Sequence, residues 1–281
     1  MLNTKTKIGL ARLAYLMVRT ARSIIGQSGR GVFARGGIRW ALDLNEGIDF
    51  SIFLLGAFEP RTLRAYRALI QRGDTVLDIG ANVGAHTLFF AQMVGNEGRV
   101  IAFEPTEFAY RKLEDNLALN PELAAIVDAR HMLLVDADGG PPPHRIFSSW
   151  PLTGGRDLHP KHLGQAQALG TVESVTLDEF VGRQSGLSPT WIKIDVDGNE
   201  YPVIMGGAET IRRFRPRIIM ELSPYTSREA GYDFAKLIEF FVELGYSFRN
   251  LENGHSLPAQ ARALEQAVPD GGGINMLLSP H

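Results

Sequence analysis

The fold prediction rests on residues 75–84, which read Thr75-Val-Leu-Asp-Ile-Gly-Ala-Asn-Val-Gly84. Residues 75–79 form a nearly continuous apolar run, which is typical of a strand buried on both faces of a sheet. A glycine-containing loop follows, and residues 87–94 continue as a predicted helix that Gly95 ends. A strand, a glycine loop and a helix in this order indicate a ligand-binding turn at the carboxyl edge of a parallel sheet.

The same alternation of strands and helices extends along the chain on both sides of this turn. Strands are predicted at 39–44, 50–55, 75–79, 99–103, 129–135, 191–196, 217–222, 246–251 and 274–278. Helices are predicted at 60–71, 87–94, 108–119, 201–214 and 234–244, with a shorter one opened by the capping box at 176–179. This pattern predicts a Rossmann-like α/β fold: a mostly parallel core sheet of about seven strands with helices on both faces.

Two regions depart from that rhythm and define the expected domain organisation. Residues 1–38 form a basic extension with helical and β segments, and residues 39–281 form the α/β domain. Within the domain, residues from about 136 to 172 are rich in glycine and proline and form an irregular insertion. We expect the insertion to consist of short strands or of a mobile loop.

Composition limits the function classes. The formal net charge of -2 over 281 residues argues against a nucleic-acid partner. With no cysteine, the chain has no disulfide, thiolate metal site or cysteine nucleophile. That usage fits a reducing compartment, so we expect a cytoplasmic protein. The seven histidines show no metal-binding spacing.

The first 42 residues contain no acid, and a helical apolar stripe runs through them. Their basic residues are Lys5, Lys7, Arg12, Arg19, Arg22, Arg30, Arg35 and Arg39, and the stripe comprises Leu10, Leu13, Met17, Ala21 and Ile24. One interpretation is a helix that packs on the domain or on a second subunit of a homo-oligomer. The other is a helix that lies on an anionic membrane surface, as in a peripheral membrane protein.

The glycine loop narrows the choice of ligand. A dinucleotide fingerprint needs glycine at its third and sixth positions, where this chain has Asn82 and Ala85. A phosphate-binding Walker loop would end in Gly-Lys-Ser/Thr, which is absent. The pattern Asp78-x-Gly80-x-x-x-Gly84 suits S-adenosylmethionine, which has no phosphate and carries an amino-acid end.

We expect Asp78 to hold the ammonium group of this cofactor and the loop amides to hold its carboxylate. Glu104 ends the next strand, where an acid favours an unphosphorylated ribose, and Asp136 follows the third strand, where it can accept from the adenine amino group. Two alternatives stay open. The loop is only a tight strand-to-helix turn in a catalytically silent module, or the chain is a nicotinamide-dependent oxidoreductase.

Several stretches together resemble the FkbM-type methyltransferases, a branch of the S-adenosylmethionine enzymes. They are 73–84, 98–105, 116–120, 175–180, 191–200 and 207–221, and they place the resemblance over roughly residues 40–251. The family usually has Glu at the position of Asp197, and it does not cover the basic extension or the insertion. The resemblance implies methyl transfer to an oxygen, often a hydroxyl of a sugar or a secondary metabolite. The predicted cofactor residues are Glu59, Asp78, Gly80, Ala81, Asn82, Gly84, His86, Thr87, Glu104, Pro105 and Asp136.

Acidic residues also gather after later strands, where an acceptor would lie beside the cofactor. Lys193, Asp195 and Asp197 alternate with apolar residues and so share one face of an extended strand. Glu200 and Glu221 are expected near the same edge, and the predicted catalytic residues are Asp195, Lys193, Glu200 and Glu221.

Three interpretations of these residues remain open. Asp195 is a general base steered by Lys193. Alternatively, Asp195, Asp197 and Glu221 bind a divalent cation. In the structural interpretation, Lys193 and Asp195 form a buried pair.

In the insertion, His144, Trp150 and Arg156 are candidates for contact with a small-molecule or carbohydrate acceptor.

Overall fold

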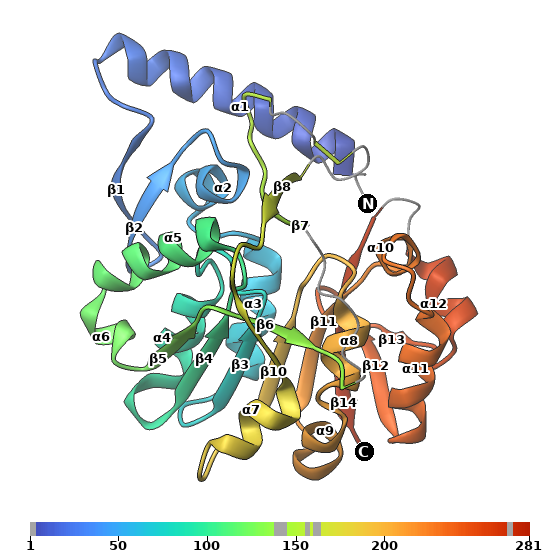
Figure 1. The fold of residues 1–281 in the computed structure, drawn as a ribbon. Helices are drawn as coiled ribbons and strands as arrows, with labels where there is room; N and C mark the ends of the chain where they lie inside the picture. Colours follow the sequence, from blue (N-terminus) through green and yellow to red (C-terminus); the bar gives the residue numbers. More distant parts are fainter. Residues whose placement is uncertain (1–3, 138–144, 155–157, 160–163, 269–271) are drawn as a thin grey trace.

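The computed structural model describes residues 4–137, 145–154, 158–159, 164–268 and 272–281, and a single large sheet lies at its centre (Figure 1). The strand order in this eight-stranded sheet is β13-β12-β14-β11-β10-β3-β4-β5. The strands are β3 (Thr75–Ile79), β4 (Arg99–Phe103), β5 (Val127–Arg130), β10 (Trp191–Ile194), β11 (Arg217–Leu222), β12 (Tyr246–Asn250), β13 (Ser256–Leu257) and β14 (Ile274–Pro280).

Five neighbouring strands of this sheet are parallel, namely β11, β10, β3, β4 and β5. β14 runs antiparallel to both β11 and β12, and it lies between them although it comes last in the chain. The predicted α/β class and mostly parallel sheet are confirmed. The two-residue strand β13 extends the sheet beyond the strands that the sequence pattern indicated.

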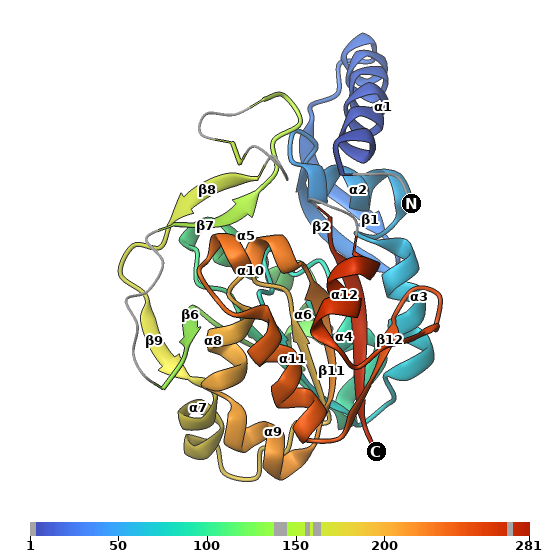
Figure 2. The same cartoon turned by 90° about the vertical axis from the view of Figure 1, so that its right-hand side faces the viewer.

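Helices cover both faces of the sheet, because successive strand residues point to opposite sides. Leu77 and Ile79 pack in one buried cluster with helices α7, α8, α9 and α11. Val76 packs in a second cluster with α2, α3, α4 and α5. Figure 2 shows the sheet from its edge, with the first group of helices on its left and α3 on its right. The helix bounds are α2 (Gly47–Leu55), α3 (Pro60–Leu69), α4 (Thr87–Val94), α5 (Glu107–Ala118), α6 (Pro121–Ala124), α7 (Leu177–Arg183), α8 (Glu200–Met205), α9 (Ala208–Phe214), α10 (Pro224–Glu229), α11 (Phe234–Glu243), α12 (Ala261–Ala267) and a 3-10 turn at Gly95–Glu97.

Three predicted strands differ from the structure. Residues 50–55 belong to helix α2, whose buried side chains include Phe50 and Ile52. A short apolar run fits a buried helix as well as a strand, and here packing decides. The predicted strand 129–135 is divided: β5 stays in the main sheet, whereas β6 (Met132–Val135) pairs with β9 (Glu173–Thr176). The strand predicted at 191–196 ends earlier, at Ile194.

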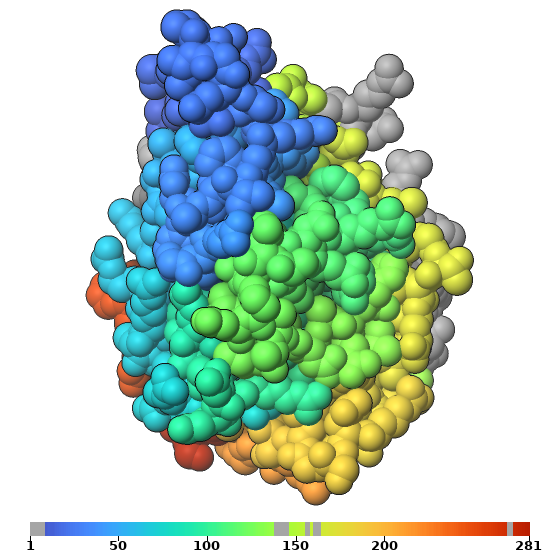
Figure 3. Space-filling view, turned by 90° about the vertical axis from the view of Figure 1, so that its left-hand side faces the viewer, coloured from blue at the N-terminus to red at the C-terminus, as the bar shows by residue number. Residues whose placement is uncertain are grey.

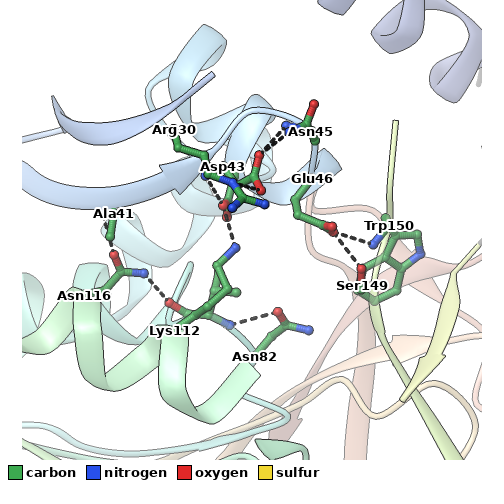
Figure 4. A network of polar contacts seen from close by, with 12 residues as sticks. Arg30, Ala41, Asp43, Asn45, Glu46, Asn82, Lys112, Asn116, Ser149 and Trp150 are labelled. Atoms are coloured by element: carbon green, nitrogen blue, oxygen red, sulfur yellow. Dashed lines mark hydrogen bonds and ion pairs between the residues drawn. The ribbon is translucent and has the colours of Figure 1, made fainter. Parts of the chain in front are cut away.

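The N-terminal segment comprises α1 (Thr4–Ile24) and the hairpin of β1 (Arg30–Arg35) and β2 (Ile38–Asp43). A polar network joins this segment to the sheet domain (Figure 4). Lys112 on α5 forms an ion pair with the buried Asp49, at 2.5 Å. Asn116 accepts from the Ala41 N–H at 2.8 Å and donates to the Val83 carbonyl at 2.9 Å. The network therefore ties the glycine loop to strand β2.

The described part of the insertion contains an antiparallel pair, β7 (Arg145–Ser149) and β8 (Gln165–Ala168). The expectation of short strands is thus confirmed for these residues. Glu46 accepts hydrogen bonds from the Ser149 hydroxyl at 2.8 Å and the Trp150 N–H at 3.2 Å. These bonds fasten the insertion to the start of α2 (Figure 4). Among the helices that the structure describes, none is long and apolar enough to cross a bilayer.

Candidate functional site

A cavity of about 1200 Å³ lies where the carboxyl ends of β3, β4, β10 and β11 meet α1, α2 and the insertion. Parallel strands place all their carboxyl ends at one edge, so this is the expected position for a ligand. The cavity is lined by most of the predicted site residues, namely Glu59, Gly80, Ala81, Asn82, His86, Glu104, Pro105, Lys193, Asp195, Asp197 and Glu221. The predicted residues that do not line it are Asp78, Gly84, Thr87, Asp136 and Glu200.

The turn after β3 brings two strands into close contact. Gly80 has a φ of +79°, and a Cβ atom there would collide with the carbonyl oxygen of Asp195. Only glycine therefore fits between the ends of β3 and β10. Gly84 has a φ of +83° and packs on the side chains of Leu88 and Leu113. Gly80 shapes the cavity, whereas Gly84 lets the following helix pack against α5.

The N–H groups of the glycine loop are already hydrogen-bonded within the protein. Those of Gly80 and Ala81 donate to the Phe103 carbonyl at 3.0 and 2.9 Å, and that of Gly84 donates to the Ala81 carbonyl at 2.9 Å. The Asn82 N–H donates to Glu104. Each of these N–H groups thus already has an acceptor within the protein, and their contact with a ligand carboxylate stays a prediction.

Glu104 directly follows strand β4, lines the cavity and is 3% exposed. One carboxyl oxygen accepts from the Asn82 N–H at 3.0 Å, and the other accepts from the N–H of Thr106 at 2.9 Å and its hydroxyl at 2.5 Å. Burial raises the pKa of Glu104, and the bonds from Thr106 and Asn82 partly offset that rise. The carboxyl group is thus fixed in orientation and can accept further hydrogen bonds from hydroxyl groups.

Asp78 is fully buried and does not line the cavity. Its carboxylate accepts from the Thr87 hydroxyl at 2.6 Å and lies 3.2 Å from the Lys193 ammonium nitrogen. The contact of Asp78 with a ligand's ammonium group stays a prediction, and in this structure the cation beside Asp78 is Lys193. Thr87 serves the same internal network.

His86 lines the cavity and packs against the rings of Phe58, Tyr66 and Phe90. Burial, and after it the positive charge of Lys193, lower the pKa of His86 to about 3. Its ring is therefore neutral near pH 7. Its Nδ1 is buried without a hydrogen-bond partner in the structure.

Asp136 lies away from the cavity because of the division between β5 and β6. The sequence pattern placed it at the end of a third core strand, but β6 leaves the main sheet to pair with β9. Asp136 is half-buried, and its charge raises the pKa of Tyr232, after burial, which is the larger cause. Asp136 is not among the residues that line the cavity, and its contact with the adenine amino group stays a prediction.

Lys193 lies on β10 and Asp195 follows directly after it, and both side chains line the cavity. The Lys193 ammonium group donates to the Gly80 carbonyl at 2.9 Å and lies 3.6 Å from an Asp195 carboxylate oxygen. Burial lowers the pKa of Lys193, but the charges of Asp78 and Asp195 outweigh that effect, so the pKa is raised. Lys193 is charged at neutral pH, and the side chain of Asp195 is 36% exposed beside it.

Three further carboxyl groups line the cavity near Asp195. Removal from bulk water raises the pKa of Glu59, and it raises those of Asp197 and Glu221 to well above the ordinary range. For each of the three, the negative charge of Asp195 is the second cause. Part of this cluster therefore retains protons that exposed carboxyl groups release, and a protonated carboxyl group can donate to a ligand hydroxyl.

Glu200 begins helix α8 and is 3% exposed, outside the cavity lining. It accepts from the Gly198 N–H at 3.1 Å. Burial raises its pKa to about 7, against the lowering effect of the backbone N–H groups that it accepts from. The bond to Gly198 holds the loop that carries Asp195 and Asp197, so Glu200 acts on the cavity through that loop.

The cation alternative required Asp195, Asp197 and Glu221 to converge on one point. Within the described ranges, no group of three or more histidine, aspartate or glutamate side chains is arranged to hold a metal ion. The three carboxyl groups line the same cavity without forming such a group.

Several residues that line the cavity were not among the predicted site residues. Asn275 on β14 donates to Glu59 at 3.0 Å and to the Thr62 hydroxyl at 3.1 Å. Arg12 on α1 also lines the cavity, and its Nε is buried without a hydrogen-bond partner. Trp150 lines the cavity as well, whereas His144 and Arg156 lie outside the described residues. No local motif marks Asn275 or Arg12, because each reaches the site only through tertiary packing.

Comparison with known proteins yields a family match and several distant likenesses. The model of the methyltransferase FkbM domain matches residues 78–248. A hexuronic acid methyltransferase of Haloferax volcanii is 23% identical over 148 residues, which are 53% of this chain. The match spans only 56% of that curated relative's length.

Two solved structures illustrate the structural likeness. A methyltransferase FkbM from Methylobacillus flagellatus KT is 14% identical, with 75% of this chain and 45% of that chain covered and a TM-score of 0.44. An O-methyltransferase from Bacillus cereus, solved in complex with SAH, is 16% identical, with 79% and 81% covered and a TM-score of 0.45.

Proposed function

This chain belongs to the FkbM family of S-adenosylmethionine-dependent methyltransferases, and from that premise we propose that it methylates a hydroxyl oxygen of a sugar, a glycan or a secondary metabolite. One observation carries the proposal. Asp195 is a partly exposed carboxylate that lines the cavity, and the buried ammonium group of Lys193 lies 3.6 Å from it. A hydroxyl acceptor loses its proton as it attacks, so a positioned base beside the cofactor is the group that the reaction needs.

In this proposal Asp195 is the general base and Lys193 is its positioning residue. The Lys193 ammonium group donates to the Gly80 carbonyl and forms an ion pair with Asp78, so the cation beside the base is fixed in position. These contacts restrict the orientation of Asp195, so less conformational entropy is lost when the reactive geometry forms. Asp197 and Glu221 then offer the acceptor groups that can exchange hydrogen bonds with its remaining hydroxyls.

The cofactor half of the cavity fits S-adenosylmethionine by the chemistry of its donors and acceptors. The cofactor supplies a methyl group on a sulfonium centre. We assign Glu104 to accept from the ribose hydroxyls, because its carboxyl group is buried, oriented and faces the cavity. Gly80 and Ala81 leave the cavity wall open to a close approach. We assign Glu59 to the ammonium group in place of Asp78, since Glu59 lines the cavity and Asp78 does not.

An acidic sugar is the acceptor class that we favour within this proposal. The curated relative is a hexuronic acid methyltransferase, which hints at sugar methylation. In this chain, the wall that α1 forms carries Arg12, whose Nε lacks a partner. A guanidinium group binds a carboxylate with good geometry, so Arg12 is suited to an acid on the acceptor.

An acceptor panel tests the proposal. The purified full chain is incubated with methyl-labelled S-adenosylmethionine and with matched neutral sugars and hexuronic acids, and labelled products are analysed for the methylated atom. Labelled O-methyl products are the expected result, and methylation at nitrogen or carbon would overturn the assignment to oxygen. Arg12→Met should raise the KM for an acidic acceptor by at least tenfold with little change for a neutral one. An equal effect on both acceptors would remove the argument for an acid.

A further inference from the structure

The apolar stripe of helix α1 points away from the protein. The structure leaves Leu10, Leu13, Met17 and Ile24 between 56% and 80% exposed, and Ala21 on the same stripe is exposed too. These residues recur at intervals of three or four, so they form one continuous face of the helix. A soluble helix normally buries such a stripe against its own domain, and this one does not.

A different face of α1 attaches the helix to the domain. Tyr15 is buried, packs edge-to-face on Phe50 and donates to the Asn45 side chain at 2.6 Å. Ala11, Ala14 and Val18 pack against the same buried cluster. Because the attachment is complete without the apolar stripe, the stripe is free to contact something else. Figure 3 shows this N-terminal segment as one end of the molecular surface.

The surroundings of the stripe carry positive charge. Residues 1–42 contain eight lysine and arginine residues and no acid. On α1, Arg19 is exposed, and the Arg22 guanidinium group lies over the ring of Phe33, 5.1 Å from its centre. Further exposed apolar side chains, Ile25 and Val32, follow directly after the helix. Apolar side chains flanked by cations are the pattern of a helix that lies in the interface of an anionic bilayer.

We propose that helix α1 docks on an anionic membrane surface, with Leu10, Leu13, Met17 and Ile24 inserted among the lipid chains and the arginines against the headgroups. The charge selects this occupant over a second copy of the chain, since two copies would bring two acid-free, basic segments together and their like charges would repel. The proposal does not depend on the methyl acceptor, because it concerns a face of α1 other than the one that reaches the cavity.

The same helix joins the two surfaces. Ala11 and Arg12 on α1 line the cavity, and the exposed apolar stripe occupies another face of the same helix. A docked helix would hold the cavity within one helix diameter of the bilayer, roughly 10 Å. Acceptors that are confined to a membrane surface would then reach the cavity without leaving it.

Vesicle co-sedimentation of the full chain tests the proposal. We expect binding to vesicles of phosphatidylcholine in which about one lipid in three is the anionic phosphatidylglycerol, and little binding to pure phosphatidylcholine. Raising the salt concentration should weaken binding, because it screens the attraction to the headgroups. Leu13→Gln combined with Met17→Gln should weaken binding by at least about tenfold, since two apolar insertions are lost without a change in charge.

Val242→Gln is the matched control, because Val242 is an exposed apolar residue on α11, away from the stripe. It should bind vesicles as the unmodified chain does. Binding of S-adenosylhomocysteine, measured by calorimetry, should be equal in all three proteins and shows that each is folded. Sedimentation velocity without lipid completes the set. A dimer that Leu13→Gln and Met17→Gln dissociate, together with no vesicle binding, would assign the stripe to a second copy and overturn the proposal, as would equal binding to neutral vesicles.

Discussion

The ammonium nitrogen of Lys193 lies 3.2 Å from a carboxylate oxygen of Asp78, and both side chains are almost fully buried. This ion pair joins strands β3 and β10 beneath the cavity, where their residues 78 and 193 are in direct register. A buried charge without its partner is strongly unfavourable, so each residue fixes the identity of the other. The pair therefore fixes the position of the Lys193 ammonium group, which lies 3.6 Å from the partly exposed carboxylate of Asp195.

Lys193→Met should lower the free energy of unfolding by about 3–5 kcal/mol, because it leaves the Asp78 carboxylate buried without a cation. Adding Asp78→Asn to that variant should restore at least about half of the loss, since the uncompensated charge is then removed too. Urea unfolding at constant pH measures both. Equal stabilities for the single and double variants would show that the pair is not coupled.

Asp195→Asn should reduce the rate of methyl transfer by about 10²- to 10⁴-fold, because the amide cannot accept the acceptor's proton. Its affinity for S-adenosylhomocysteine should stay within a few fold, which calorimetry can check. Asp115→Asn, a change of the same kind on the exposed side of α5, is the control and should keep normal turnover. Normal turnover in Asp195→Asn would remove Asp195 from the chemistry.

Glu104→Gln should weaken S-adenosylhomocysteine binding by about ten- to a hundredfold, because hydrogen bonds to a charged acceptor are replaced by bonds to a neutral amide. Glu107→Gln lies on the exposed first turn of α5 and should bind normally. Calorimetric titration of the two variants side by side gives the comparison. Unchanged affinity in Glu104→Gln would disprove the ribose assignment.

Glu200 should make the protein less stable as pH rises through the range from about 4.5 to about 7. Its pKa in the folded protein is raised to about 7 from an ordinary value of 4.5, mainly by burial. The folded state thus binds more protons than the unfolded state between these values, and stability falls as pH rises, by about 3 kcal/mol in total for this group.

Glu200→Gln should therefore flatten the pH dependence and raise stability most at pH 8. Urea unfolding of this variant from pH 4 to pH 8 provides the measurement. Glu243→Gln, an exposed acid at the end of α11, serves as the control and should leave the slope unchanged. A slope that persists in Glu200→Gln would mean that other carboxyl groups produce it.

Local patterns were enough to predict the centre of the fold and one side of the site. The apolar run 75–79 and the loop after it set the position of the cavity edge, and alternation in 191–195 placed Lys193 and Asp195 on one face. These features depend on strand periodicity, which is encoded within a few residues. The location of Glu104 at the next strand end followed from the same rule.

The remaining features depend on partners that are distant in the sequence. The motif around Asp78 predicts a ligand contact, but it cannot show that Lys193, more than a hundred residues later, forms an ion pair with Asp78. Asp136 moves away because β9, some forty residues later, draws β6 out of the main sheet. The apolar stripe of α1 was visible, but periodicity alone could not tell that a second face, centred on Tyr15, would dock instead.

Strand β14 inserts between β11 and β12 and carries Asn275 to Glu59. The segment that pairs with β11 here lies about fifty residues further along the chain. The cavity wall around Glu59 thus forms only when these distant segments pair, whereas the wall around Gly80 and Glu104 is built from strands that are close in the sequence.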